Sequence, residues 1–209
     1  MEFYPASERG DNHRGPPTPL KTRVPSNTTN RVRIIGGAWR SRRVRFPAGE
    51  GLRPTPDRVR ETLFNWLGQD LSAKRCLDLY AGTGVLSLEA ASRGAALAVA
   101  VDHSRAAIDA IAAAKAMLSA DALELHVADA RAFIGRESRL FDVVFLDPPF
   151  DDEPWDWLLP ATVARLAPGG YVYAEAGRAI RPPPGFSVWR SDTAGQVHYH
   201  LFVRSTLES

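Results

Sequence analysis

From residue 75 onward, apolar segments of strand length alternate with helical segments, and this alternation limits the chain to few folds. Strands in such a pattern pair in parallel, because each helix returns the chain to the starting edge of the sheet. Strands are expected at 75–80, 97–102, 123–129, 141–147 and 171–176. The helices between them are expected at 85–94, at 104–120, near Ala130–Ile134, and through 162–166 up to Pro168-Gly169-Gly170.

Two further strand segments, 186–190 and 196–204, follow one another with only the residues SDTAG between them. Without a helical crossover they are expected to pair as an antiparallel hairpin at the edge of the sheet. The predicted fold class is therefore α/β, mostly parallel, with an antiparallel C-terminal edge hairpin.

The segment 54–68 predicts an amphipathic helix in front of this sheet. Thr55 suits the N-cap, Pro56 the first helical position and Gly68 the end. Apolar residues follow at helical spacing, at Val59, Leu63, Trp66 and Leu67.

The charge is split along the chain. Residues 1–60 hold 13 Lys and Arg against 5 Asp and Glu, a net of +8, whereas the remainder has a net of −6. Within 31–53, two segments that alternate basic and apolar residues flank Gly36-Gly37, which predicts a small β-hairpin. The arginines there offer forks for phosphate, and Trp39 and Phe46 offer stacking faces, which favours a nucleic-acid surface over a merely charged edge strand. These arginines are Arg31, Arg33, Arg40, Arg42, Arg43, Arg45 and Arg53.

We therefore divide the chain into a disordered tail at 1–30, a basic hairpin extension at 31–53 and the α/β domain at 54–209. The proline-rich tail is assigned no role.

A single cysteine, Cys76, excludes a disulfide framework or a zinc cluster, and His198 and His200 lack a third ligand beside them. No apolar run reaches the length of a membrane span and no secretory signal is recognisable. We expect a cytoplasmic monomer with no metal and no membrane partner.

The first chemical motif is the turn DLYAGTG, which follows the strand that Asp78 ends and contains Gly82 and Gly84. Glycines at such a turn let a ligand approach the backbone closely. A dinucleotide site would need a third glycine where Ser87 stands, and Asp78 would repel a pyrophosphate. The acid suits a cationic amino group, such as that of S-adenosylmethionine (SAM), although a plain tight turn remains the alternative.

Two more acids stand at the ends of strands. Asp102 lies 20 residues beyond Gly82, the spacing at which an acid accepts the hydroxyls of a ribose. Asp129 could accept the amino group of adenine, or equally cap the short helix that follows it.

The motif Asp147-Pro148-Pro149-Phe150 follows the apolar segment FDVVFL. Prolines there could simply form a rigid exit from the strand. An exocyclic amine is a poor nucleophile, because its lone pair is delocalised into the ring. The Asp147 carboxylate and the Pro148 carbonyl could instead bind both of its N–H groups and so localise the lone pair on the nitrogen. Phe150 would then stack on the base.

These motifs together resemble the class I SAM-dependent methyltransferases that modify amino groups. The blocks GLRPTPDRVRETLFNWL, RVRIIGGAWRSRRV and AGQVHYHLFVR resemble, more specifically, the bacterial 16S rRNA guanine-N2 methyltransferases of the small subunit. The resemblance covers roughly residues 31–204 and implies a Rossmann-like sheet. It departs at Asp102, where the family commonly has Glu, and the tail 1–30 has no clear counterpart.

The resemblance implies SAM as cofactor and 16S rRNA, free or in the assembling small subunit, as partner. It further implies the guanine at rRNA position 966 as the acceptor. The motif Asp147, Pro148, Pro149 and Phe150 would receive the flipped guanine, and Thr55 and Arg58 would lie near the mouth of the site, on the RNA side. The cofactor-binding residues would be Asp78, Tyr80, Ala81, Gly82, Thr83, Gly84, Asp102, His103, Asp129 and Ala130.

Three alternatives stay open. The acceptor could be adenine N6 in DNA or a protein glutamine, because the DPPF motif is shared with those methyltransferases. An NAD-dependent oxidoreductase is disfavoured by Ser87 and Asp78. A non-catalytic RNA-binding protein is disfavoured because it would need neither motif.

Overall fold

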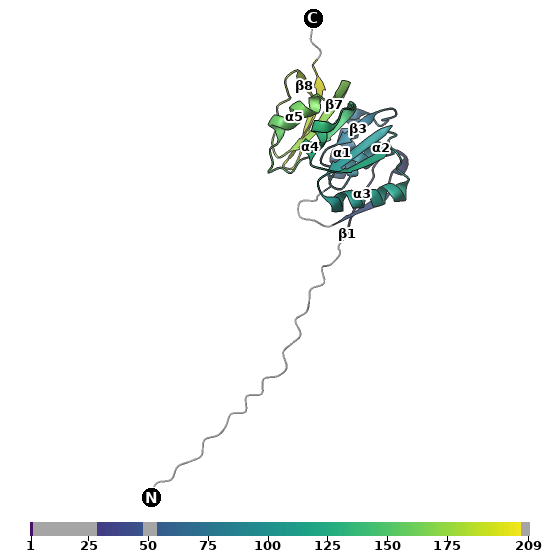
Figure 1. Cartoon of the computed structure of the whole chain (residues 1–209), viewed down its shortest axis with the longest axis vertical. Coiled ribbons are helices and arrows are strands. Elements are labelled where there is room, and N and C mark those ends of the chain that lie inside the picture. The colour runs from purple at the N-terminus through teal and green to yellow at the C-terminus, as the bar shows by residue number, and fades with distance from the viewer. Residues whose placement is uncertain (2–28, 48–53, 206–209) are drawn as a thin grey trace.

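The computed structural model describes residue 1 and residues 29–47 and 54–205. Most of the predicted tail, and Arg53, lie outside these ranges. One twisted sheet runs through the centre, with helices on both faces (Figure 1). Its seven strands, in chain order, are β3 (Arg75–Asp78), β4 (Leu97–Asp102), β5 (Leu123–Val127), β6 (Phe141–Leu146), β7 (Leu166–Ala176), β8 (Phe186–Ala194) and β9 (Val197–Arg204).

The order across the sheet is β5-β4-β3-β6-β7-β9-β8. The strands from β5 to β7 pair in parallel, and β9 pairs antiparallel with both β7 and β8. The mostly parallel sheet with an antiparallel C-terminal edge is thus confirmed. The chain winds outward in opposite directions from β3 and β6, and α/β proteins bind ligands at such a switch point.

The helices form two layers. One layer contains α1 (Asp57–Leu67), α2 (Val85–Ser92) and α3 (Arg105–Leu118), whose apolar residues share a buried cluster with one face of the sheet. The second layer contains α4 (Ala130–Arg136) and α5 (Trp155–Val163), which cover the other face. No helix within the described ranges has both the length and the apolar character needed to cross a membrane.

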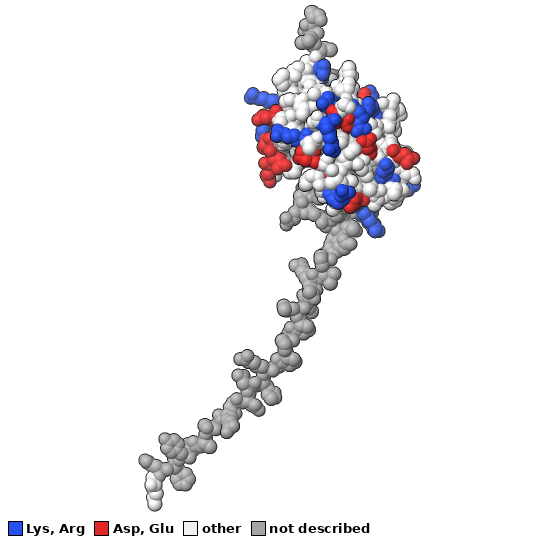
Figure 2. Space-filling view, viewed as in Figure 1, with Lys and Arg blue, Asp and Glu red and all other residues white. Residues whose placement is uncertain are grey.

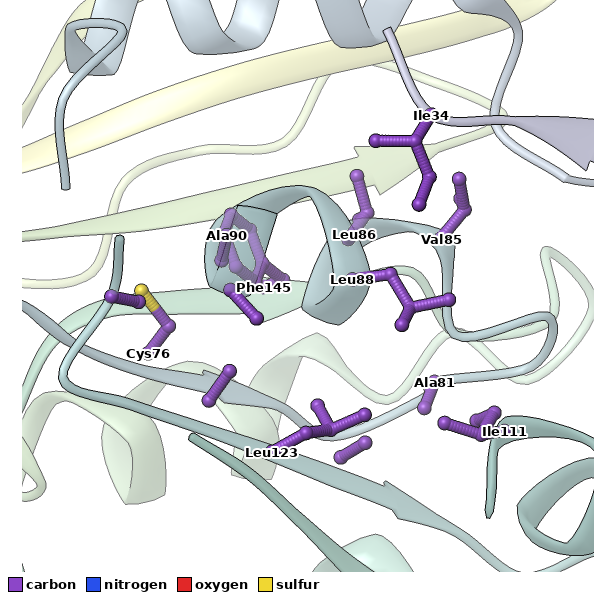
Figure 3. Close-up of a cluster of buried hydrophobic side chains, with 14 of the residues drawn as sticks. Ile34, Cys76, Ala81, Val85, Leu86, Leu88, Ala90, Ile111, Leu123 and Phe145 are labelled. Carbon is purple, nitrogen blue, oxygen red and sulfur yellow. The ribbon is translucent and has the colours of Figure 1, made fainter. Parts of the chain in front are cut away.

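The predicted N-terminal hairpin is present as β1 (Thr29–Arg33) and β2 (Arg43–Pro47), joined through the short 3-10 helix η1 (Gly37–Trp39). It begins two residues inside the predicted tail. It packs on the first helix layer, because its inward side chains, including Val32 and Val44, belong to the same buried cluster as α2 and α3. Figure 3 shows Ile34 lying against Val85 and Leu86 of α2.

The loop of the hairpin touches the end of α2 so closely that a glycine is required. A Cβ on Gly37 would lie 1.9 Å from the Ser92 carbonyl oxygen, and its φ is +71°. The Ser92 hydroxyl accepts the Trp39 N–H at 2.9 Å and donates to the Gly36 carbonyl at 2.6 Å. The predicted extension is therefore built into the domain.

Three local predictions were wrong. Helix α1 begins at Asp57 with Pro56 at its N-cap, so Thr55 does not cap it. Helix α5 ends at Val163, and Pro168-Gly169-Gly170 lie inside β7, where Gly169 has a φ of +73° and the register against β6 shifts. A bulge absorbs the residues that were expected to stop a helix. Strand β8 extends to Ala194, so the edge hairpin turns through only Gly195 and Gln196.

Candidate active site

Four carboxylates line the carboxyl edge of the sheet, each at or directly after the end of one of four neighbouring strands. Across β4, β3, β6 and β7 they are Asp102, Asp78, Asp147 and Glu175. Asp78 and Asp147 lie on either side of the switch point. Parallel strands that end together thus gather residues that are far apart in sequence.

Asp78 is 2 % exposed, and one of its two carboxylate oxygens has a partner. Oδ2 accepts the Ser87 hydroxyl at 2.7 Å, whereas Oδ1 is buried without a hydrogen bond. Burial raises the Asp78 pKa to about 7, and the nearby Asp102 charge adds to the shift. An unpartnered buried acceptor is costly, and an ammonium group would both satisfy it and favour its ionised form.

The glycine turn is tied to the neighbouring strand. Asp102 accepts the Gly82 N–H through Oδ2 and the Ser104 N–H through Oδ1, each at 2.8 Å. A carboxylate has about four acceptor positions, so two remain for the hydroxyls of a ribose. Gly84 has a φ of +73°, and a Cβ there would lie 2.6 Å from Ile111 of α3.

The remaining predicted cofactor residues lie around the same turn. Ala81, Thr83 and Ala130 are buried, and Tyr80 is half-buried, while His103 is exposed. Asp129 caps α4 by accepting the Ala132 N–H at 2.9 Å, which is one of its two predicted roles. Burial raises the Tyr80 pKa to about 12, and the negative charge of Asp129 makes the second-largest contribution to this shift. Tyr80 and Asp129 therefore lie near each other.

The DPPF motif leaves β6 as an open acceptor surface. The Asp147 carboxylate and the Pro148 carbonyl accept no hydrogen bond from any residue that the structure describes. The Pro149 carbonyl accepts the Asp152 N–H at 3.0 Å, which closes the turn behind them. Phe150 is 42 % exposed and lies beside Gly177, where an added Cβ would be 3.7 Å from its ring. The motif therefore presents two adjacent acceptors and one accessible aromatic face.

Sequence reasoning missed Glu175. This residue is 3 % exposed and follows Ala174, which pairs with Leu146, so it stands opposite Asp147. Loss of hydration raises the Asp147 pKa well above the ordinary range, and the Glu175 charge adds to this shift. Burial also raises the pKa of Glu175 itself to about 7. The sequence does show an acid inside the apolar segment YVYAEA. Burying a charge is costly, so an acid at such a position indicates a specific interaction or a functional role.

The outward face of the hairpin is basic. Arg31 lies opposite Arg45, and Arg33 lies opposite Arg43, with all four side chains exposed. Arg33 donates to Asp57 at 2.9 Å. Figure 2 shows basic side chains at the lower end of the globule, where Figure 1 places β1. Like charges directly across a strand pair repel, so this arrangement favours an anionic partner.

The structure changes the expected roles of several residues near this face. Phe46 is 3 % exposed and packs in the core, so its predicted stacking role is wrong. Trp39 is half-buried and packs against the same core. Thr55 is 5 % exposed and hydrogen-bonds Glu175, which places it beneath the surface, whereas Arg40, Arg42 and Arg58 are exposed.

Other predictions concern residues outside this edge. Cys76 is buried. Within residues 29–47 and 54–205, no group of three His, Cys, Asp or Glu side chains has a metal-binding arrangement. His200 accepts the Ile180 N–H at 3.2 Å and stacks on Phe202.

A family model described as conserved hypothetical protein 95 matches residues 32–203. The chain belongs to this family. It is 38 % identical over 185 residues to the ribosomal RNA small subunit methyltransferase D of Escherichia coli, which covers 84 % of this chain and 91 % of that protein. The protein of the same name from Haemophilus influenzae is 33 % identical, covering 84 % and 95 % respectively.

Solved structures agree with this membership. The Escherichia coli protein yhhF superposes with a TM-score of 0.76 at 37 % identity, covering 84 % of this chain and 98 % of that one. The resemblance to the small-subunit rRNA methyltransferases, and the Rossmann-like methyltransferase fold that it implied, are thereby confirmed.

Proposed function

We propose that this chain transfers the methyl group of SAM to the N2 amine of a guanine in 16S rRNA, at position 966 by the family resemblance. One observation carries the proposal. The buried Asp78 oxygen without a partner and the open Asp147–Pro148 acceptors lie at the carboxyl ends of the neighbouring strands β3 and β6, at the switch point. A cation-binding group thus lies beside an amine-binding group.

Each residue of the site has its own proposed role in binding SAM or the guanine. When bound, SAM supplies an electrophilic methyl group on a sulfonium. Asp78 would hold its ammonium, Asp102 its ribose, and Tyr80 and Asp129 the side of its adenine. Asp147 and Pro148 would accept the two N–H groups of the guanine amine, and Phe150 would stack on the ring. Such alignment is worth ~7–11 kcal/mol of barrier.

The basic face of the hairpin would hold the RNA. Arg31, Arg43 and Arg45 wall a groove of about 410 Å³ against α3, with Ala110 and Met117 among its apolar residues. Arginine side chains bind phosphates bidentately, and an apolar floor accommodates a base or a ribose. This surface favours a polyanionic acceptor over a protein glutamine, and the similarity to rRNA methyltransferases favours RNA over DNA adenine.

Two further proposals follow from the chemistry. Methyl transfer from a sulfonium is a direct displacement, so no metal is assigned to it. We also propose that the chain acts as a monomer on rRNA in the cytoplasm, and gel filtration with light scattering tests its oligomeric state.

The test is transfer from tritiated SAM to small ribosomal subunits, free rRNA, DNA and protein. We expect label in guanine of the small-subunit rRNA, identified after nuclease digestion as the N2-methyl nucleoside. Asp147→Ala should retain SAM binding and lose turnover by about 100-fold or more. Label in DNA adenine or in glutamine, or no label at all, would contradict the proposal.

A further inference from the structure

Two acids are neighbours across β6 and β7. Phe145 pairs with Tyr173 and Leu146 with Ala174, so the next residues on the two strands are Asp147 and Glu175. Phe145 and Tyr173 belong to the buried cluster on the α1 side of the sheet. Because side chains alternate between faces, Asp147 and Glu175 both extend toward that side.

Hydrogen bonds distinguish the two acids. The Tyr173 hydroxyl donates to Glu175 Oε1 at 2.8 Å, and the Thr55 side chain also hydrogen-bonds the Glu175 carboxylate. Both interactions lower the Glu175 pKa, which burial raises. Asp147 receives no such bond from the described residues. Donors favour the ionised form, so whenever the pair holds a single proton, Asp147 holds it and Glu175 carries the negative charge.

We propose that Glu175 is a positioning residue for methyl transfer, whose charge beside Asp147 makes Asp147 the acceptor for the proton that the guanine amine loses. This inference rests on the proposed function, because it assigns a role within that site. Glu175 acts through Asp147 and is not itself required to touch the substrate.

The step balances in atoms and charge. The amine lone pair forms the new N–C bond, the C–S bond breaks, and its electrons remain on sulfur. The nitrogen is then cationic and releases one N–H proton to the Asp147 carboxylate. The resulting carboxylic acid is stabilised by the adjacent negative Glu175, since one proton between two neighbouring carboxylates relieves their repulsion.

Other groups face the pair from the elements around it. Asp78 of β3 contributes its charge to Asp147, and Tyr173 lies on β7 itself. Thr55 reaches Glu175 from the segment before α1. Tyr199 of β9 pairs directly with Glu175, and its hydroxyl donates to Asp192 at 2.8 Å. None of these side chains brings a positive charge to the pair.

The test is the pH dependence of methyl transfer under single-turnover conditions with saturating SAM and small subunits. Saturation keeps Asp78 paired with the SAM ammonium, so its titration does not enter the profile. The rate of the wild-type protein should rise with pH as Asp147 ionises. Glu175→Gln removes the neighbouring charge while retaining an acceptor for Tyr173, and should move this rise to lower pH by about one unit or more.

Two further variants complete the experiment. Glu175→Asp keeps the charge and should leave the rise near its wild-type position. Asp121→Asn, an exposed acid at the amino end of β5, should change nothing. If the wild-type protein methylates small subunits and Glu175→Gln shows the same pH profile as the wild type, only the proposed role of Glu175 is overturned. Absence of wild-type activity on small subunits would instead overturn the proposed function.

Discussion

Arg60 and Glu89 form a fully buried ion pair that joins α1 to α2. The same Glu89 also pairs with Arg93 and accepts the Ile35 N–H at 2.8 Å. Arg60 in turn donates to the Arg33 carbonyl at 2.9 Å and to the Thr55 carbonyl at 3.0 Å. This network therefore ties the basic hairpin, the first helix and the segment beside Glu175 into one unit. Arg60 therefore has a structural role, although it is one of the basic residues counted in segment 1–60.

The first prediction concerns this ion pair. Arg60→Ala should lower the free energy of unfolding by about 3–5 kcal/mol, because Glu89 would lose a partner that burial makes necessary. Arg58→Ala, two residues away and exposed, should change it by less than about 0.5 kcal/mol. Urea denaturation followed by circular dichroism measures both. Equal effects of the two variants would show that the Arg60 pair contributes nothing special.

The second prediction isolates the close approach of the hairpin loop to α2. Gly37 and Gly169 have nearly the same φ, +71° and +73°, but only Gly37 has atoms within 4 Å of an added Cβ. Gly169→Ala should cost about 1 kcal/mol from backbone strain alone. Gly37→Ala should cost at least about 2 kcal/mol more, because the Cβ would overlap the Ser92 carbonyl. Thermal denaturation of the two variants provides the difference, and similar losses would argue against a tight contact.

The third prediction concerns SAM binding. Asp78→Asn should weaken it about 10- to 100-fold, the value of a hydrogen bond to a charged group. The reason is that Asn keeps the shape but not the charge opposite an ammonium. Ser87→Ala, which removes only the donor to Oδ2, should weaken SAM binding less. Calorimetry measures both affinities, and full affinity in Asp78→Asn would remove Asp78 from the cofactor site.

The fourth prediction is the pH dependence of the same interaction. The Asp78 pKa is raised from 3.8 to about 7 in the free protein. The folded chain therefore holds a proton that the unfolded chain has lost, and this contribution to stability declines as pH rises from about 4 to about 7. Because SAM requires the ionised acid, its affinity should increase up to pH ~7 and then level off. Titrations in buffers of different ionisation enthalpy should detect the released proton, and a flat profile would contradict the assignment.

The fifth prediction tests the basic face. The double variant Arg31→Ala/Arg45→Ala should weaken RNA binding and lower the slope of log Kd against log salt by about 1.5, for two lost phosphate contacts. SAM affinity should not change. Lys74→Ala removes a charge that lies beside Asp142, before the first residue of β3, and that is not part of the basic face, so it serves as the control. An unaltered salt slope in the double variant would place the RNA elsewhere.

Much of the candidate site could be predicted from sequence because its parts are local. The Asp78 turn and the DPPF motif each follow an apolar strand, and parallel strands must end at one edge. Glu175 stood out only as an acid inside an apolar strand, and its role beside Asp147 could not be predicted, because that role depends on which strand lies beside β6 and in which register. Arg60 carried a local signal, since it lies at helical spacing from Leu63, Phe64 and Leu67 on the apolar stripe. Its partner, Glu89, comes from another helix.

The sequence by itself determined the succession of strands and helices, the acids at the strand ends and the basic charge of the front end. Periodicity, turn residues and composition are properties of neighbouring residues, and short segments suffice to specify them. Only the tertiary structure decided that Phe46 and Arg60 face inward while Arg31 and Arg45 face outward, and that Asp147 meets Glu175. Burial and pairing are long-range properties, since each depends on segments that meet only when the sheet and its two helix layers assemble.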